Sequence, residues 1–260
     1  MIPFYFGTSS LPLFGAHSPP SKGARDSAVV LVPPMGQEAI RAHRAIRQLG
    51  LRLARERFHA LRFDLRGTGD SAGDFADARV DAWVEDTCTA MDELRDRTGV
   101  QRVSLVGLRL GAAVAWRATR GRRDVDKVVL WEPVVSGARY LSDLGKRHED
   151  FLRAELPRRR TAPFERAGEA LGYPLSKELS SDIAEIDLTN EAKPDARALC
   201  VVTTPEAEDR ALETRLPTLT PRSDFMRLTV VQDWNSDEAV NTSLVPSEAL
   251  DAIVKALVER

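Results

Sequence analysis

The stretch RVSLVGLRLGAAVAW, residues 102–116, decides the fold of this chain. Its first half is rich in valine and leucine with little polar alternation, as in strands buried on both faces of a parallel sheet. Its second half contains the run AAVA, which lets a helix pack closely on a sheet. Gly107 and Gly111 flank Arg109, and a strained turn from strand to helix requires small residues on both sides. We therefore predict a strand, a tight turn centred on Arg109 and a helix.

The same alternation of strand and helix extends over the chain. Further apolar runs predict buried strands at 28–34, 59–65, 127–133, 198–204 and 226–232. Two segments near the N-terminus, 3–7 and 13–18, predict a hairpin. Helical periodicity covers 38–57, 80–97 and 246–260. This alternation predicts an α/β fold with a mainly parallel, doubly wound sheet and right-handed crossovers.

In the first of these helices, Ile40, Ile46, Leu49 and Leu53 recur on one side, which we expect to face the sheet.

The segment 137–193 departs from the pattern, because it is charged and interrupted by proline and glycine. It is much longer than the connections usual in such folds. We therefore expect a core formed by 1–136 and 194–260, with 137–193 inserted as a helical lid over the ends of the strands.

Composition narrows the class of protein. The chain has 260 residues, of which 43% are hydrophobic, and its formal net charge is −2. Such a balance gives no electrostatic reason to expect binding to nucleic acid or to an anionic membrane. Cys88 and Cys200 match no metal or redox spacing, and no stretch suits a signal peptide or a membrane span. We expect a cytoplasmic protein without a metal or a cofactor.

Three motifs follow successive predicted strands: VPPMGQE at 32–38, FDLRGTGDSAG at 63–73 and GLRLG at 107–111. This arrangement resembles the α/β-hydrolase superfamily. More narrowly, it resembles the serine-aminopeptidase-like branch, which includes hydrolase-like proteins associated with exosortase systems. The signature D-x-R-G-x-G-x-S-x-G of that branch is matched by Asp64, Arg66, Gly67, Gly69, Ser71 and Gly73. The resemblance implies an α/β-hydrolase fold in which GLRLG is the nucleophile elbow.

The resemblance implies a catalytic triad, but two of its positions lack the required residue. Arg109 stands where the elbow nucleophile belongs, and a protonated guanidinium cannot attack a carbonyl. The family's histidine would follow the last strand, yet the segment 231–243 contains none. Acidic residues in 203–209 could supply only the third member. Ser-His-Asp catalysis is therefore predicted to be absent.

Part of the machinery depends on the backbone and could remain. The resemblance implies an oxyanion hole formed by the amides of Leu110 and Met35, where side-chain identity matters little. The sequence leaves two roles open for Arg109: it could bind an anionic ligand at the helix end, or it could pair with Glu132 after the neighbouring strand.

Other candidates have less specific signals. His43, on the same predicted helix as Glu38, could act as an acid or base at the rim of the site or be an ordinary surface histidine. Trp234 lies in the loop that lacks the histidine and could plug or line the pocket. Ser71 is expected to stabilise a turn.

Three functions remain open at this point. The first is a non-hydrolytic protein that binds a small acidic or acyl ligand through Arg109, Leu110, Met35, Glu132 and Trp234. The second is an ester, thioester or amide hydrolase or acyl transferase of another mechanism, with Arg109, Glu132 and His43 as catalytic candidates. The third is an interaction module that docks a protein partner, or a second copy of the chain, through the lid.

Overall fold

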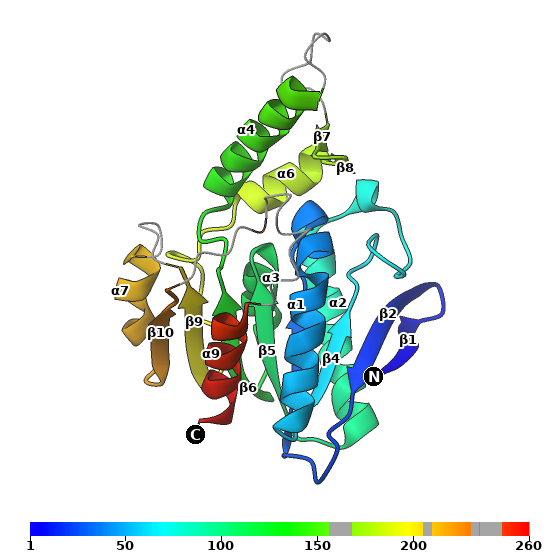
Figure 1. Cartoon of the computed structure of the whole chain (residues 1–260), viewed down its shortest axis with the longest axis vertical. Coiled ribbons are helices and arrows are strands. Elements are labelled where there is room, and N and C mark those ends of the chain that lie inside the picture. Colours follow the sequence, from blue (N-terminus) through cyan, green and yellow to red (C-terminus); the bar gives the residue numbers. More distant parts are fainter. Residues whose placement is uncertain (156–167, 205–209, 230–233, 235–245, 260) are drawn as a thin grey trace.

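The computed structural model of the chain describes residues 1–155, 168–204, 210–229, 234 and 246–259. These residues contain an eight-stranded sheet in the order β1-β2-β4-β3-β5-β6-β9-β10 (Figure 1). Its strands are β1 Ile2–Thr8, β2 Leu11–Ser18, β3 Ser27–Val32, β4 His59–Phe63, β5 Arg102–Leu108, β6 Val125–Trp131, β9 Ala198–Thr203 and β10 Ser223–Arg227. Strand β2 pairs antiparallel with β1 and β4, whereas the remaining pairs are parallel. The sheet confirms the predicted fold class and the N-terminal hairpin.

Helices cover both faces of the sheet. Helix α1 (Gly36–Arg55) and helix α9 (Ser247–Val258) pack on one face. Helix α2 (Val80–Thr98), helix α3 (Leu110–Ala118) and helix α7 (Arg210–Leu219) pack on the other (Figure 1). Both layers bury apolar side chains against the strands, which is the main stabilisation of such a three-layer fold.

Two sequence predictions need correction. The strand predicted at 226–232 begins earlier, at Ser223, and β10 ends at Arg227, while residues 230–232 lie outside the described part of the chain. β10 is a half-exposed edge strand, and its pairing with β9 does not require an apolar run. After it, the Leu228 amide donates to the Thr203 carbonyl at 2.7 Å. Ile40 does not share the buried face of α1, since it is 57% exposed.

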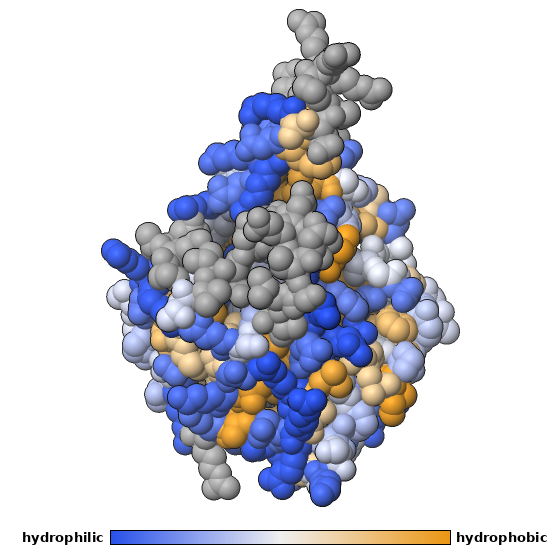
Figure 2. All heavy atoms as spheres, viewed as in Figure 1, coloured by the Kyte–Doolittle hydropathy of each residue, from blue (hydrophilic) through white to orange (hydrophobic). Residues whose placement is uncertain are grey.

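The connection between β6 and β9 forms a separate layer above the carboxyl ends of the strands (Figure 1). It contains helix α4 (Gly137–Glu155), the short hairpin of β7 (Glu169–Ala170) and β8 (Tyr173–Pro174), and helix α6 (Lys177–Ala184). Figure 2 shows one flank of α4 as hydrophilic and the other as apolar. A Cβ atom on Gly137 would lie 1.6 Å from the Ile183 carbonyl oxygen, so glycine allows α4 to begin directly against α6.

None of the described helices has the length and apolar character needed to cross a membrane. Both cysteines are free thiols.

Candidate active site

The turn at Arg109 has the geometry of a nucleophile elbow. Arg109 has φ 54° and ψ −119°, a region that side chains other than glycine rarely adopt. Its amide donates to the Trp131 carbonyl at 3.0 Å, and its own carbonyl accepts from the Val134 amide at 3.2 Å. These bonds hold the strained residue between the ends of β5 and β6.

The two glycines make this turn sterically possible. A Cβ atom on Gly107 would lie 2.3 Å from the Gly111 carbonyl oxygen, and one on Gly111 would lie 2.3 Å from the Pro33 carbonyl oxygen. Real Cβ atoms do not approach backbone oxygens so closely. The first glycine therefore lets α3 leave β5 sharply, and the second brings the loop after β3 into contact with the elbow. The turn predicted from the glycine spacing is confirmed.

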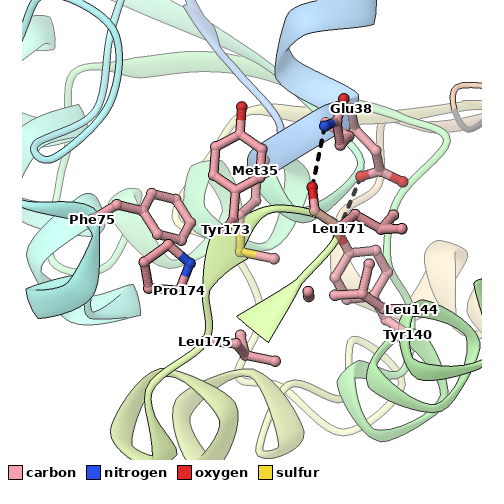
Figure 3. Close-up of a pocket in the computed structure, with 12 residues that line it drawn as sticks. Met35, Glu38, Phe75, Tyr140, Leu144, Leu171, Tyr173, Pro174 and Leu175 are labelled. Carbon is pink, nitrogen blue, oxygen red and sulfur yellow. Dashed lines mark hydrogen bonds between the residues drawn. The ribbon is translucent and has the colours of Figure 1, made fainter. Parts of the chain in front are cut away.

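The guanidinium of Arg109 pairs with Glu38 in the first turn of α1. Its Nε lies 3.1 Å from Glu38 Oε1, and its Nη1 donates to the main-chain carbonyl of Glu132 at 3.3 Å. The ion pair with the Glu132 side chain was one of the two roles left open, and Arg109 pairs with Glu38 instead, because α1 brings this carboxylate to the same place. Tyr140 of α4 donates from its hydroxyl to Glu38 Oε2 at 3.2 Å (Figure 3).

This network is buried and electrostatically matched. The side chain of Glu38 is 4% exposed and that of Arg109 is 21% exposed. Burial opposes the charge of Arg109, but the nearby Glu38 carboxylate outweighs it and raises the pKa of the guanidinium. Burial, reinforced by Glu38, raises the pKa of Tyr140 well above its ordinary value. Tyr140 therefore remains a neutral donor, and Arg109 remains charged.

Glu132 has a different partner. Its Oε2 accepts from Trp234 Nε1 at 2.9 Å, and the indole packs edge-to-face on Trp131 with ring centroids 5.3 Å apart. Trp234 is 5% exposed, so it fills space behind the elbow. The carboxylate of Glu132 faces the Trp234 indole, whereas its carbonyl faces Arg109.

The two expected oxyanion donors lie at helix N-termini. Leu110 is the first residue of α3, and Met35 is the N-cap of α1. Among the described residues, neither amide has a hydrogen-bond acceptor. The contact between Gly111 and Pro33 brings the two loops together, as an oxyanion hole requires.

Little space remains beside these groups. A cavity of about 20 Å³ is lined by Met35, Glu38, Tyr140, Tyr173 and neighbouring apolar side chains (Figure 3). It is closed by the β7–β8 hairpin, where the Leu171 carbonyl accepts from Gln37 Nε2 at 3.1 Å. The amide of Leu171 donates to His148 Nδ1, also at 3.1 Å. The cavity accommodates about one water molecule.

His43 does not lie at this site. Its Nε2 accepts from Arg62 Nη1 at 2.9 Å, and it lines a separate open cleft between α1 and the residues that follow β4. Burial, with Arg62 beside it, lowers the pKa of His43. Ser71 has the turn role expected from the sequence: its hydroxyl donates to the Asp64 carbonyl at 2.6 Å and accepts from the Phe14 amide at 2.9 Å.

The sequence did not indicate Tyr140, because a tyrosine inside a charged insertion carries no specific signal. Glu38 had a partial signal, since it follows the loop after the first parallel strand. Most residues of the expected acid and histidine loops, 205–209 and 235–243, lie outside the described residues. Within the described part of the chain, no cluster of three or more His, Cys, Asp or Glu residues could hold a metal ion.

Comparison with known proteins agrees with this architecture. The family model described as Serine aminopeptidase, S33, matches residues 23–219. No curated protein matches the sequence.

Solved structures similar to this chain include several hydrolases. An esterase from Pyrococcus furiosus has a TM-score of 0.68 at 18% identity, covering 98% of this chain and 89% of that one. A proline iminopeptidase from Mycobacterium smegmatis has a TM-score of 0.64 at 14% identity, covering 98% and 97%. N-formylmaleamic acid deformylase from Pseudomonas putida S16 has a TM-score of 0.59 at 18% identity, covering 99% and 100%. At such identities the likeness shows the fold alone. Together with the family match and the elbow geometry, it leads to one conclusion: the chain belongs to the serine aminopeptidase S33 family of α/β hydrolases.

Proposed function

We propose that this chain is a non-hydrolytic member of its family that binds a small neutral acyl ligand at the former catalytic centre. The observation that carries the proposal is Arg109 in the elbow, with its charge already matched by the buried Glu38. A guanidinium that stays protonated cannot act as a nucleophile. The sequence also has no histidine after His148, so a general base in the family's position is lacking.

An acyl ligand suits the remaining groups better than an acidic one. A neutral carbonyl oxygen could accept from the amides of Leu110 and Met35, which have no acceptor among the described residues. An anion would approach one guanidinium and two carboxylates, those of Glu38 and Glu132. Since Glu38 already pairs with Arg109, little positive charge remains to stabilise a second anion.

The small cavity requires a moving cover, and we propose that 137–193 acts as a lid. The β7–β8 hairpin contacts the body through Gln37, and helix α4 contacts it through the Tyr140–Glu38 bond. Helix α6 is anchored to the body, because Asp182 pairs with Arg79 at 2.7 Å and accepts from the Val80 amide at 3.1 Å. Opening for a ligand would therefore involve α4 and the hairpin. In the closed form this lid would limit the access of water to Arg109, whose side chain is 21% exposed.

Hydrolysis can be tested directly. The protein is incubated with a fluorophosphonate probe and, separately, with a panel of aryl esters, thioesters and amides. We expect neither covalent labelling nor turnover above that of the Arg109→Ala variant. Labelling at any serine would overturn the proposal. Turnover that disappears in Arg109→Ala would favour an enzyme of another mechanism.

Binding needs its own measurement. Small amides and esters, and carboxylates of the same size, are compared by their effect on the thermal midpoint of unfolding. We expect the neutral compounds to stabilise the protein and the carboxylates to have little effect. The Tyr140→Phe variant serves as a control for the fold, because it removes one hydroxyl and leaves the backbone donors in place. Stabilisation by carboxylates alone would show an anion site instead.

A second candidate rests on the surface of the lid. Phe151 of α4 is 51% exposed, which suits docking of a protein partner or a second copy of this chain. Phe151→Asp should then abolish the association while Arg109→Ala leaves it intact. The opposite result would assign the function to the pocket.

A further inference from the structure

A second cleft among the described residues is much larger than the cavity at Arg109. It has a volume of about 720 Å³ and lies between the first half of α1, the end of β4 and the turn that follows it. It shares only Gly36, Phe75 and Tyr173 with the closed cavity. Small-molecule sites in proteins commonly have volumes in this range.

The cleft has an apolar side with aromatic rings. Phe75 and Tyr173 form an edge-to-face pair with centroids 5.3 Å apart, and both line the cleft. Ile40 and Ile46 contribute from α1. The 57% exposure of Ile40 leaves a large apolar side chain available at the opening, where a ligand could bury it.

The cleft also has a positive and a negative group side by side. Arg62 and Asp64 are two positions apart at the end of β4 and both line the cleft, since alternate side chains of an extended chain point to one face. The two groups form no ion pair with each other. Asp64 Oδ2 instead accepts from the Asp70 amide at 3.1 Å, and Arg62 donates to His43.

Neither charge is fully satisfied by the protein. Arg62 Nε is buried without a hydrogen-bond partner among the described residues. Burial lowers the pKa of Arg62 and raises that of Asp64, which is the direction expected for groups that lack strong partners. His43 accepts a hydrogen bond from Arg62 and so orients the guanidinium. Asp70 adds a negative charge at the rim, and Arg47 lies close enough to affect His43 and Arg62.

We propose that this cleft binds a small zwitterion with an apolar or aromatic body, of the type of a free aromatic amino acid. The carboxylate of the ligand would pair with Arg62 and its ammonium group with Asp64, while its side chain would cover Ile40, Phe75 and Tyr173. A ligand with a single charge would satisfy one of the two groups and meet repulsion from the other. This site does not depend on the function proposed for Arg109.

The first experiment needs no variant. Isothermal titration calorimetry compares L-phenylalanine with N-acetyl-L-phenylalanine, which lacks the cation, and with L-phenylalaninamide, which lacks the anion. We expect L-phenylalanine to bind about tenfold or more tightly than either derivative, because each loses one charge-assisted contact. Equal affinity for the three compounds, or no heat with any of them at millimolar concentration, would overturn the proposal.

Substitutions then locate the site. Asp64→Asn should reduce the affinity for L-phenylalanine to that for the N-acetyl compound, and Arg62→Gln should reduce it to that for the amide. The matched controls are Asp81→Asn and Arg55→Gln, which make the same charge changes at exposed residues. They should leave the affinity for L-phenylalanine unchanged. Tyr140→Phe, in the closed cavity, should also leave the affinity unchanged. Loss of binding in the controls, or retention of the preference in both cleft variants, would contradict this assignment.

Discussion

Two charged clusters lie near the amino end of α1, and they are organised in opposite ways. In the closed site, Arg109, Glu38 and Tyr140 contact one another and leave a cavity of about 20 Å³. In the open cleft, Arg62 and Asp64 face about 720 Å³ without contacting each other. The pKa values follow this difference, because the pKa of Arg109 is raised whereas the pKa of Arg62 is lowered. Contact between opposite charges makes the first cluster structural, and separation leaves the second available for a ligand.

The largest effect is expected from breaking the closed cluster. Glu38→Gln would leave the buried guanidinium of Arg109 without its carboxylate, and we expect the free energy of unfolding to fall by about 3 kcal/mol. Urea unfolding measures this change. Glu93→Gln is the matched control, because Glu93 pairs with Arg97 at 2.7 Å on the surface, where a pair contributes less than about 1 kcal/mol.

Equal losses in the two variants would show that the Arg109 network has no special structural role. In that event the contrast with the open cleft would fail. The double variant Glu38→Leu with Arg109→Met adds a further check, since it removes both charges and should recover most of the lost stability.

A smaller effect is expected from the turn that carries Arg109. Gly107→Ala would place a Cβ atom 2.3 Å from the Gly111 carbonyl oxygen, and the required backbone shift should cost about 2 kcal/mol. Gly50→Ala in α1 is the control, because its nearest neighbours would be 3.7 Å away, and it should stabilise by about 0.5 kcal/mol. Thermal unfolding compares the two. A destabilised Gly50→Ala protein, or an unaffected Gly107→Ala protein, would contradict this account.

The smallest change in the free energy of unfolding, and one of opposite sign, is expected from a substitution in the open cleft. Burial raises the pKa of Asp64 above 3.8. Its carboxylate therefore weakens the fold by an amount that grows as the pH rises from 3.8 to the raised value, is complete above that value, and disappears below 3.8. Asp64→Asn should therefore stabilise the protein at pH 7 by up to about 1 kcal/mol, reduced by solvent access. Unfolding of both proteins across pH 4 to 7 measures the difference. A gain that shrinks with rising pH would show that Asp64 is stabilised by its surroundings.

The sequence predicted the central strands and the elbow well. Gly107 and Gly111 indicated the turn because a steric demand acts locally and leaves only one residue type. The apolar runs indicated the central strands because both of their faces are buried. The exposed edge strand β10 lacks that constraint, and its position was therefore predicted about three residues too late.

The partner of Arg109 could not be identified from the sequence as the turn could. Glu132 lies at the end of the neighbouring strand, as the sequence suggests, but its carboxylate bonds to Trp234. Glu38 and Tyr140 approach from α1 and α4, and their positions depend on how separate layers pack. The local sequence does not determine distances between residues of separate layers. His43 is an exposed histidine of α1 that contacts Arg62, which agrees with the second of the two roles left open for it.

The Arg109 network also has a consequence for the kinetics of folding. Arg109 and Glu38 are 71 positions apart, and Tyr140 and Glu38 are 102 positions apart. Contacts that close such long loops form after local structure has been made, so we expect them to be absent from the folding transition state. Breaking them should accelerate unfolding and leave the folding rate nearly unchanged. The network of Arg109, Glu38 and Tyr140 would then slow unfolding and lengthen the lifetime of the folded state.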